Sequence, residues 1–516
     1  MSDDNRRMEA PKTGVKVRMY RQGLGDCFLL AFRASDGGAR YMLIDCGVLR
    51  STPDEKQTME KVMENIRAAT GGHLHVLVVT HEHYDHFCGF SHAEETFRQI
   101  EIDEVWLAWT EDSGHPFAAQ MHRAQEEKRR AVQAAAQRLR EAKESGAETV
   151  AAHLDALFSF SEAAAAADAE DEPATGFRSA KALQIVRSRV EKPRFCRPSH
   201  SPLSLPGVEG VRIYVLGPPE NDIIKKSNPT KRGQEVYDLA AARSVEGAFL
   251  EAARHSHEKN DDLSSDDREQ RDLNFPFDKH HQLRFEDVEK NVGGRFSWFH
   301  RHYFVPPVQL KMDFESEMEP KLAPEQRNWR RIDHDWLGAA GALALKLDSD
   351  TNNTSLALAI ELGDGQVLLF PADAQVGNWL SWEGLSWPAR DAGKPPVTTL
   401  DLLRRTVLYK VGHHASHNAT LRAKGLELME SPDLVALIPV DEEVARRQGV
   451  KGWDMPFPPL LRRLSEKTRG RVIRSDKGKP KQKHDLLSGA QWRRFDDRAV
   501  ETDLWVELSV EERSGE

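Results

Sequence analysis

The sequence predicts a layered α/β fold, and three observations support this prediction. Short hydrophobic runs with the composition of β-strands recur in the first 110 residues and again after residue 354. Residues 55–70, between two of these runs, place apolar side chains at helical spacing. Residues 356–370 alternate, turn at a Gly-Asp-Gly sequence and return, as a hairpin does. Strands that alternate with helices pack in layers around a hydrophobic core.

The first 110 residues are expected to form strands separated by turns. The helix predicted at Glu55–Thr70 ends at Gly71-Gly72, because glycine commonly stops a helix. The predicted strands are Val15–Tyr20, Phe28–Phe32, Tyr41–Asp45, Val76–Thr80 and Val105–Trp109.

The middle of the chain has a different composition. From Ala118 to about Lys192 it is rich in alanine and charge, with apolar stripes that predict surface helices. This segment is either a structural insertion or a helical cap over a site. Between residues 258 and 272 acidic residues predict a mobile segment. The aromatic and basic run Trp298–Phe304 could act as a lid or pack at the surface.

We therefore divide the chain into five parts. Residues 1–115 form the first half of the fold, 116–200 a helical insertion, and 201–220 a strand that returns to the core. Residues 221–350 form an irregular insertion with the acidic segment, and 351–516 the second half with a basic C-terminal extension. Closing strands are expected at Leu434–Pro439 and Leu504–Leu508.

Composition limits the class of protein. The formal net charge of −10 over 516 residues argues against a protein that coats nucleic acid. Basic residues crowd the stretch Arg462–Lys483, which is either a solvated face with a flexible loop or a phosphate-binding track. The four cysteines contain no C-x-x-C pair, so we expect them to be reduced and structural. No apolar run is long enough to span a bilayer and none follows the N-terminus as in a signal peptide, so we expect a cytoplasmic location without a membrane partner.

The chemistry is concentrated in the turn after Val76–Val79. Here His81, His83, Asp85 and His86 follow a hydrophobic strand at the spacing H-x-H-x-D-H. Two histidines separated by one residue can direct both imidazoles at one cation, and the Asp-His pair can reach a second. Imidazole nitrogen and carboxylate oxygen are ligands that Zn²⁺ prefers and Mn²⁺ accepts. A histidine-rich surface loop would not explain four such ligands at a strand end, so this spacing predicts a metal site.

Three further strand ends carry polar residues. Asp45 follows Tyr41–Ile44, Asp373 follows Val367–Ala372, and His413-His414-Ala415-Ser416 follows Val407–Gly412. In this order the four motifs resemble those of the metallo-β-lactamase superfamily. The resemblance implies an αββα sandwich with one or two metal ions at its edge.

The resemblance also implies a role for each motif. Asp45 would brace a metal-binding histidine. His81 and His83 would bind one ion, and Asp85, His86 and His413 the other, with Asp373 bridging both. His414 would be free to assist the leaving group, although it could exchange roles with His413. Ala372 and Ala415 stand where the family has glycine.

One departure concerns the first ion. The usual third histidine is missing, because Val211–Leu216 ends in Gly217-Pro218-Pro219. Water or a residue from elsewhere would then complete the site on His81 and His83. The same lack is familiar from the branch that is similar to the soluble domain of competence DNA-uptake proteins (ComEC-like). This branch also shares the Gly23–Leu30 and Asn352–Leu356 motifs, and the whole resemblance covers about residues 15–110, 205–220 and 351–440.

The function implied is metal-dependent hydrolysis with a metal-bridging hydroxide. Two Zn²⁺ ions are expected, with Mn²⁺ as the alternative. Asp85 and His414 would serve catalysis, and the substrate would be a small phosphodiester or a nucleic acid. Contacts to substrate are expected from Asp26, Lys410 and Ser416, although Lys410 could equally pack in its strand. The alternatives are a lactone or ester hydrolase and a non-catalytic binding module. The sequence gives no indication of the oligomeric state.

Overall fold

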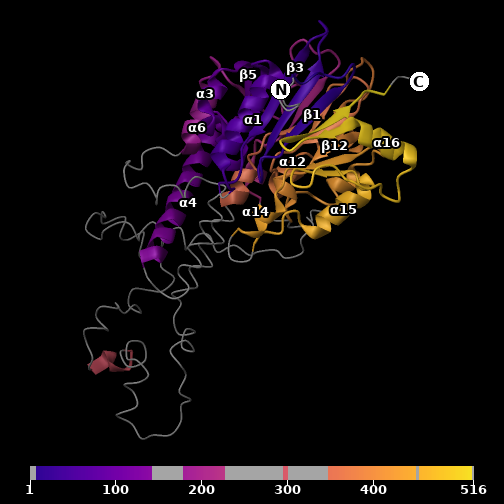
Figure 1. Cartoon of the computed structure of the whole chain (residues 1–516). Helices are drawn as coiled ribbons and strands as arrows, with labels where there is room; N and C mark the ends of the chain where they lie inside the picture. Colours follow the sequence, from indigo (N-terminus) through magenta and orange to yellow (C-terminus); the bar gives the residue numbers. More distant parts are fainter. Residues whose placement is uncertain are drawn as a thin grey trace. The chain divides into compact units, whose positions relative to one another are not determined.

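The computed structural model describes residues 7–50, 52–141, 178–226, 294–299, 347–448 and 452–513 (Figure 1). The chain divides into two compact units. The first comprises residues 1–129, 151–242 and 344–516, and it contains every predicted site residue. The second comprises residues 130–150 and 243–343. Its described part is the end of helix α4 (Pro116–Glu141), η6 (Gly294–Phe296) and α10 (Ser297–Phe299).

The first sheet has eight strands, and in it strands from the N-terminal and C-terminal parts of the chain pair with each other. Its strand order is β15-β16-β1-β2-β3-β4-β5-β6. The strands from β15 to β3 pair antiparallel, whereas β3, β4, β5 and β6 run parallel. The bounds are β15 (Ala499–Glu501), β16 (Trp505–Val510), β1 (Val15–Tyr20), β2 (Cys27–Arg33), β3 (Ala39–Cys46), β4 (His73–Val79), β5 (Glu101–Ala108) and β6 (Arg194–Cys196).

The second sheet has six strands in the order β14-β13-β12-β9-β8-β7. The first four run parallel, and β8 pairs antiparallel with both β9 and β7. The bounds are β14 (Val472–Arg474), β13 (Val435–Ile438), β12 (Thr406–Lys410), β9 (Val367–Phe370), β8 (Ala357–Glu361) and β7 (Arg212–Gly217). A separate two-stranded pair is formed by β10 (Ser386–Trp387) and β11 (Val397–Thr398).

The two sheets pack face to face through one apolar cluster. Side chains such as Val17 and Phe28 from the first sheet meet Leu358 and Phe370 from the second. The rings of Phe28 and Phe370 lie edge to face with centroids 5.6 Å apart. Each such buried side chain stabilises the fold by roughly 1.5–3 kcal/mol.

Helices cover the outer face of each sheet. Buried side chains of α1, α2 and α6 pack on the first sheet, and those of α12, α13 and α15 pack on the second. Figure 1 shows α1 and α6 beside the strands of the first sheet and α12 and α15 beside those of the second. The order helix, sheet, sheet, helix is that of the metallo-β-lactamase fold, which confirms the predicted fold class. The helices are α1 (Glu55–Thr70), α2 (Tyr84–His92), α3 (Glu94–Arg98), α6 (Arg178–Arg187), α12 (Val376–Ser381), α13 (Thr399–Arg404), α14 (Glu442–Arg446), α15 (Pro458–Thr468) and α16 (Gly489–Arg498).

Most predicted elements are present with small shifts of their ends. The helix at Glu55–Thr70 and the strand at Val15–Tyr20 have the predicted bounds. The strand predicted at Val76–Thr80 begins earlier, at His73. The acidic segment and residues 300–304 lie outside the described residues. No helix in the described part of the chain has the length and apolar character that crossing a bilayer requires.

The basic stretch Arg462–Lys483 is structured, because it contains most of α15 and all of β14. The part of the stretch after β14, residues 475–483, forms turns and irregular chain. Several of its charges are paired within the unit. These ion pairs are Arg463 with Glu427, Arg474 with Asp476, Lys479 with Asp496, and Lys481 with Glu501.

Candidate metal centre

The histidine turn is built by the end of β4 and the start of α2. Strand β4 ends at Val79, and His83 is the residue before the first turn of α2. His81 and His83 therefore lie on the connecting turn, whereas Asp85 and His86 lie on the helix. The Nε2 atom of His81 lies 3.1 Å from the Nδ1 atom of His83. Burial lowers the pKa of His83 to about 4 and that of His81 well below its usual range, so both rings are neutral and suited to bind a cation.

Asp45 braces the turn, as the resemblance implies. It lies at the end of β3 in the left-handed region, with φ 57°. Its Oδ1 atom accepts from the backbone N–H of Thr80 at 2.8 Å, and its Oδ2 atom accepts from the Thr80 hydroxyl at 2.7 Å. The Oδ2 atom also lies 2.7 Å from the Nδ1 atom of His86. The carboxylate thereby holds the Nδ1 proton of His86 and turns Nε2 toward the interior.

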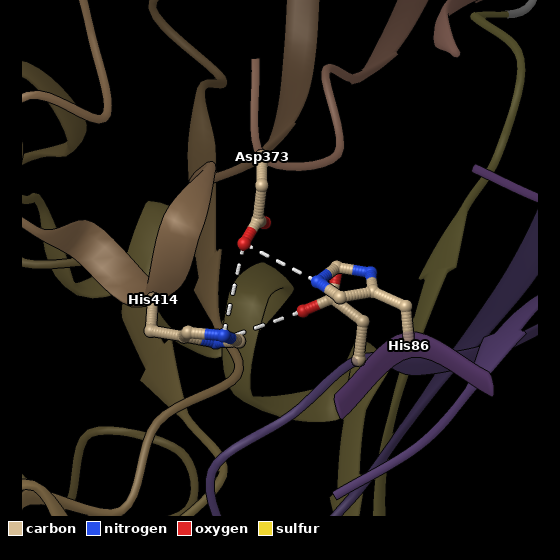
Figure 2. A group of neighbouring side chains, drawn as sticks. His86, Asp373 and His414 are labelled. Carbon is tan, nitrogen blue, oxygen red and sulfur yellow. Dashed lines mark ion pairs between the residues drawn. The ribbon is translucent and has the colours of Figure 1, made fainter. Parts of the chain in front are cut away.

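His86, Asp373 and His414 converge from three separate elements (Figure 2). The Nε2 atom of His86 lies 3.2 Å from the Oδ2 atom of Asp373, which follows β9. The Nε2 atom of His414, which follows β12, lies 2.8 Å from the Oδ2 atom of Asp85 and 3.8 Å from that of Asp373. Strands β9 and β12 are parallel neighbours, so Asp373 and His414 follow them at the same edge of the second sheet, and His86 meets them there from α2.

The two oxygens of Asp373 have different surroundings. Its Oδ1 atom accepts from the backbone N–H of His413 at 2.9 Å and from the Lys410 ammonium at 3.2 Å. Its Oδ2 atom is buried and has no hydrogen-bond partner in the structure. Asp373 is therefore held by one oxygen and presents the other to the imidazoles of His86 and His414.

Lys410 joins the carboxylates rather than facing a substrate. Its ammonium lies 2.5 Å from the Oδ2 atom of Asp26, 3.2 Å from Asp373 and 2.9 Å from the carbonyl oxygen of Ala372. These three acceptors match its three protons. Burial opposes the charge, but Asp26 and Asp373 outweigh it and raise the pKa of Lys410 above its ordinary value. Both Lys410 and Asp26 are buried, so the structure gives them a role in support of Asp373 in place of the expected substrate contact.

The sequence left open which of the two adjacent histidines faces the site. His413, His414 and Ala415 all have positive φ, at 42°, 50° and 62°. His414 points its Nε2 atom at Asp85, while its Nδ1 atom lies 2.7 Å from the carbonyl oxygen of Pro439. His413 gives Asp373 its backbone N–H, and its Nδ1 atom lies 2.9 Å from the hydroxyl of Ser416. The structure thus places His414 where His413 was expected, because the left-handed turn directs the two rings differently.

The same turn accounts for Ser416 and the two alanines. The Ser416 hydroxyl is buried, donates to Asn418 at 2.7 Å and contacts His413, so it orients His413 rather than a substrate. Ala372 and Ala415, which replace the family's glycines, have φ of 52° and 62°. A left-handed conformation costs a residue with a side chain roughly 1–2 kcal/mol, so the turn is kept despite that cost.

A carboxylate that the sequence analysis missed also reaches the site. Asp348 lies in the helical residues 347–352, and its Oδ1 atom is 3.8 Å from the Nε2 atom of His83. Burial raises the pKa of Asp348 well above its usual range, and the negative charges of Asp373 and Asp85 add to this effect. Its place shortly before the Asn352–Leu356 motif is a signal in the sequence, but nothing there separates it from Asp350.

The charges of the site favour the binding of a cation. Burial would lower the pKa of His86, but the carboxylates of Asp373, Asp26, Asp85 and Asp45 outweigh it and raise that pKa well above the ordinary value. The pKa of His414 is raised in the same way, mainly by Asp373 and Asp85. Since the Nδ1 atoms of both rings face acceptor oxygens, each Nε2 must carry a proton or face a cation.

The donor set fits divalent metal ions. Asp26, His86, Asp373 and His414 each place one ligand atom within 4.8 Å of the others. Several buried atoms that face this space have no hydrogen-bond partner in the structure, although such atoms normally do. They are His86 Nε2, Asp85 Oδ1, Asp373 Oδ2, Asp26 Oδ1 and Asp348 Oδ1.

A second group of histidines lies at the start of β4, and the sequence analysis missed it. His73, His75 and Asp103 also bring one ligand atom each within 4.8 Å of one another. The Nε2 atom of His73 pairs with Asp103 at 2.9 Å, and both side chains are well exposed. The Nδ1 atom of His75 accepts from the backbone N–H of Tyr41 at 3.1 Å.

Comparison with known proteins agrees with this geometry. Residues 20–119 match the family model of the metallo-beta-lactamase superfamily, a range that includes Asp45 and the whole histidine turn. This superfamily consists typically of metal-dependent hydrolases that bind divalent metals. The matched segment ends before Asp348, Asp373 and His414. No curated protein and no solved structure matches the chain.

Proposed function

We propose that this protein is a binuclear metal-dependent hydrolase that acts on phosphodiesters. The observation that carries the proposal is the set of buried imidazole and carboxylate atoms that converge at the sandwich edge without hydrogen-bond partners. A silent copy of the fold has no need for buried, uncompensated charge of this kind, which is costly to keep.

Two metal positions are assigned. The first metal position comprises His81 and His83. The second metal position comprises Asp85, His86 and His414, with Asp373 shared between the two. Zn²⁺ is proposed because the donors are imidazole and carboxylate, and Mn²⁺ is the alternative. Ions bound here would lower the pKa of a water molecule and stabilise negative charge on a substrate oxygen.

Hydrogen bonds from neighbouring residues fix the orientation of the proposed metal ligands. Asp45 fixes the tautomer of His86, and the carbonyl oxygen of Pro439 fixes that of His414. Lys410 occupies the Oδ1 atom of Asp373, which keeps Oδ2 available. Asp85 contacts His414 across the site and joins the two halves of the sandwich. These contacts preorganise the donors, which reduces the reorganisation needed at the reaction.

A phosphodiester is proposed as the substrate on two grounds. The motifs at Gly23–Leu30, Asn352–Leu356 and His413–Ser416 are similar to those of the ComEC-like branch, which favours this chemistry. A binuclear centre also suits the charged transition state of phosphoryl transfer. Between a small diester and a polymer, the charges favour the small diester. The net charge is −10, and much of the basic stretch Arg462–Lys483 is engaged in ion pairs.

The test is a panel assay of protein loaded with Zn²⁺ or with Mn²⁺. The substrates are bis-(p-nitrophenyl) phosphate, single-stranded DNA, a lactone and a β-lactam. We expect the phosphate diester to be hydrolysed fastest, and Asp373→Asn to remove this activity. Hydrolysis of the lactone alone would instead indicate a lactone or ester hydrolase. Metal binding without hydrolysis of any substrate would indicate a binding module.

The salt dependence of the rate tests whether the substrate is a nucleic acid or a small diester. If single-stranded DNA is bound along the basic stretch, its hydrolysis should fall steeply with salt while the small diester is barely affected, because only the polymer releases many counterions. We expect the two substrates to respond to salt alike. A steep loss for DNA alone would overturn the assignment of a small substrate.

A further inference from the structure

We propose that Asp348 supplies the third protein ligand of the first metal position, together with His81 and His83. This inference rests on the proposed function, since it concerns the same metal centre. It identifies the residue that takes the place of the missing third histidine. Asp348 lies outside the residues that match the family model.

The end of β7, where the family's third histidine is expected, cannot carry a side chain here. A Cβ atom on Gly217 would lie 1.9 Å from the Oδ1 atom of Asn378. The Asn378 side chain is buried and donates to the carbonyl oxygens of Asn353 and Ser355, so it is not free to move away. A third protein ligand for His81 and His83 would therefore come from another element.

Asp348 approaches the first metal position from the segment that leads into β8. Its Oδ2 atom accepts from the side-chain amide of Asn352 at 3.0 Å, which fixes the orientation of the carboxylate. Its Oδ1 atom is buried, has no hydrogen-bond partner in the structure, and lies 3.8 Å from the Nε2 atom of His83. One oxygen is thus held and the other is presented toward the histidine pair, the arrangement also seen at Asp373.

The charges around Asp348 call for a cation. Asp373 and Asp85 both act on Asp348 as like charges. The nearby ammonium of Lys410 forms its ion pairs with Asp26 and Asp373. By contrast Asp350, two residues further along the same helix, forms an ion pair with Lys128 at 3.0 Å. A metal ion between Asp348 and the histidines would supply the positive charge that Asp350 receives from lysine.

The first experiment measures metal stoichiometry and affinity in the full-length protein. Zn²⁺ is titrated into metal-free wild type, Asp348→Asn and the matched control Asp350→Asn. We expect Asp348→Asn to lose affinity at one of two sites by more than about 100-fold, since a group that only orients a ligand is worth roughly 10–100-fold. Asp350→Asn should bind both ions as wild type does.

The second experiment tests ligation directly. Asp348→Cys is loaded with Co²⁺, which accepts a thiolate ligand and then absorbs strongly in the near ultraviolet through charge transfer from sulfur. We expect this absorption in Asp348→Cys but in neither wild type nor Asp350→Cys, because the native cysteines pack in the hydrophobic core rather than beside the two histidines.

The outcomes separate the inference from the proposed function. Wild type that binds no metal would remove both. Wild type with two ions, together with an Asp348→Asn variant of unchanged or only 10–100-fold weaker affinity, would overturn the ligand role of Asp348 alone. A cobalt-loaded Asp348→Cys variant without the charge-transfer absorption would do the same.

Discussion

Strand β4 has a His-x-His sequence at each end, and the two pairs have different surroundings. At its start, His73 is half-buried and pairs with Asp103, while the buried His75 accepts from the backbone N–H of Tyr41. Just beyond its end, His81 and His83 are buried near Asp348, whose Oδ1 atom has no hydrogen-bond partner in the structure. The same spacing therefore yields a pair with ordinary hydrogen-bond partners in one place, and in the other a pair beside a carboxylate oxygen that has none. Surplus negative charge, rather than spacing or burial, distinguishes the pair at the proposed metal centre.

The largest effect is expected from Asp373, the carboxylate shared by both metal positions. Asp373→Ala should lower the rate of diester hydrolysis by roughly 10³-fold, because the donors that face its Oδ2 atom lose their common partner. The rate is measured with bis-(p-nitrophenyl) phosphate. Asp103→Ala, at the other end of β4, is the matched control and should leave the rate unchanged. Wild-type turnover in Asp373→Ala would show that the bridge is misassigned.

The sequence predicted which strand ends carry the residues of the site. It did not predict which side chains at those ends point into the site. Asp45, His81, His83, Asp85, His86 and Asp373 follow hydrophobic strands, and the fold brings these strand ends together. The spacing did not settle which of His413 and His414 faces inward, because that depends on three consecutive left-handed residues. It also did not reveal Asp348, whose role depends on Asn378 closing the end of β7.

The second prediction compares the buried ion pairs of Lys410 with an exposed lysine ion pair. Lys410→Met should destabilise the metal-free protein by about 3–5 kcal/mol, because Asp26 and Asp373 lose their buried counter-charge. Lys424→Met removes the exposed ion pair with Glu383 and should cost only about 0–1 kcal/mol. The free energy of unfolding is measured by denaturant titration. Equal effects of the two substitutions would contradict the role of Lys410.

The combined contribution of four buried histidines to the stability of the metal-free protein should be greatest near pH 6.5, the ordinary pKa of histidine. The pKa of His83 and that of His413 lie at about 4 in the folded chain, so their contribution is lost as pH falls below about 6.5. His86 and His414 have raised pKa values, so their contribution is full below about 6.5 and is lost as pH rises through the folded values. Each group changes stability by up to about 1.4 kcal/mol per pH unit.

Calorimetry across pH measures this profile. Metal loading should remove the loss on the alkaline side, since the ions replace the protons of His86 and His414. A metal-free protein whose stability rises steadily above pH 7 would contradict the charge assignment of these two histidines.

The comparison of the two His-x-His pairs is tested most directly by the zinc content of the purified protein. Wild type, His81→Ala/His83→Ala and His73→Ala/His75→Ala are prepared without chelator, dialysed against metal-free buffer and measured by elemental analysis. We predict about two zinc ions per chain in wild type and in His73→Ala/His75→Ala, but at most one in His81→Ala/His83→Ala. Loss of zinc on substitution of His73 and His75, with full zinc content in the other variant, would contradict the account.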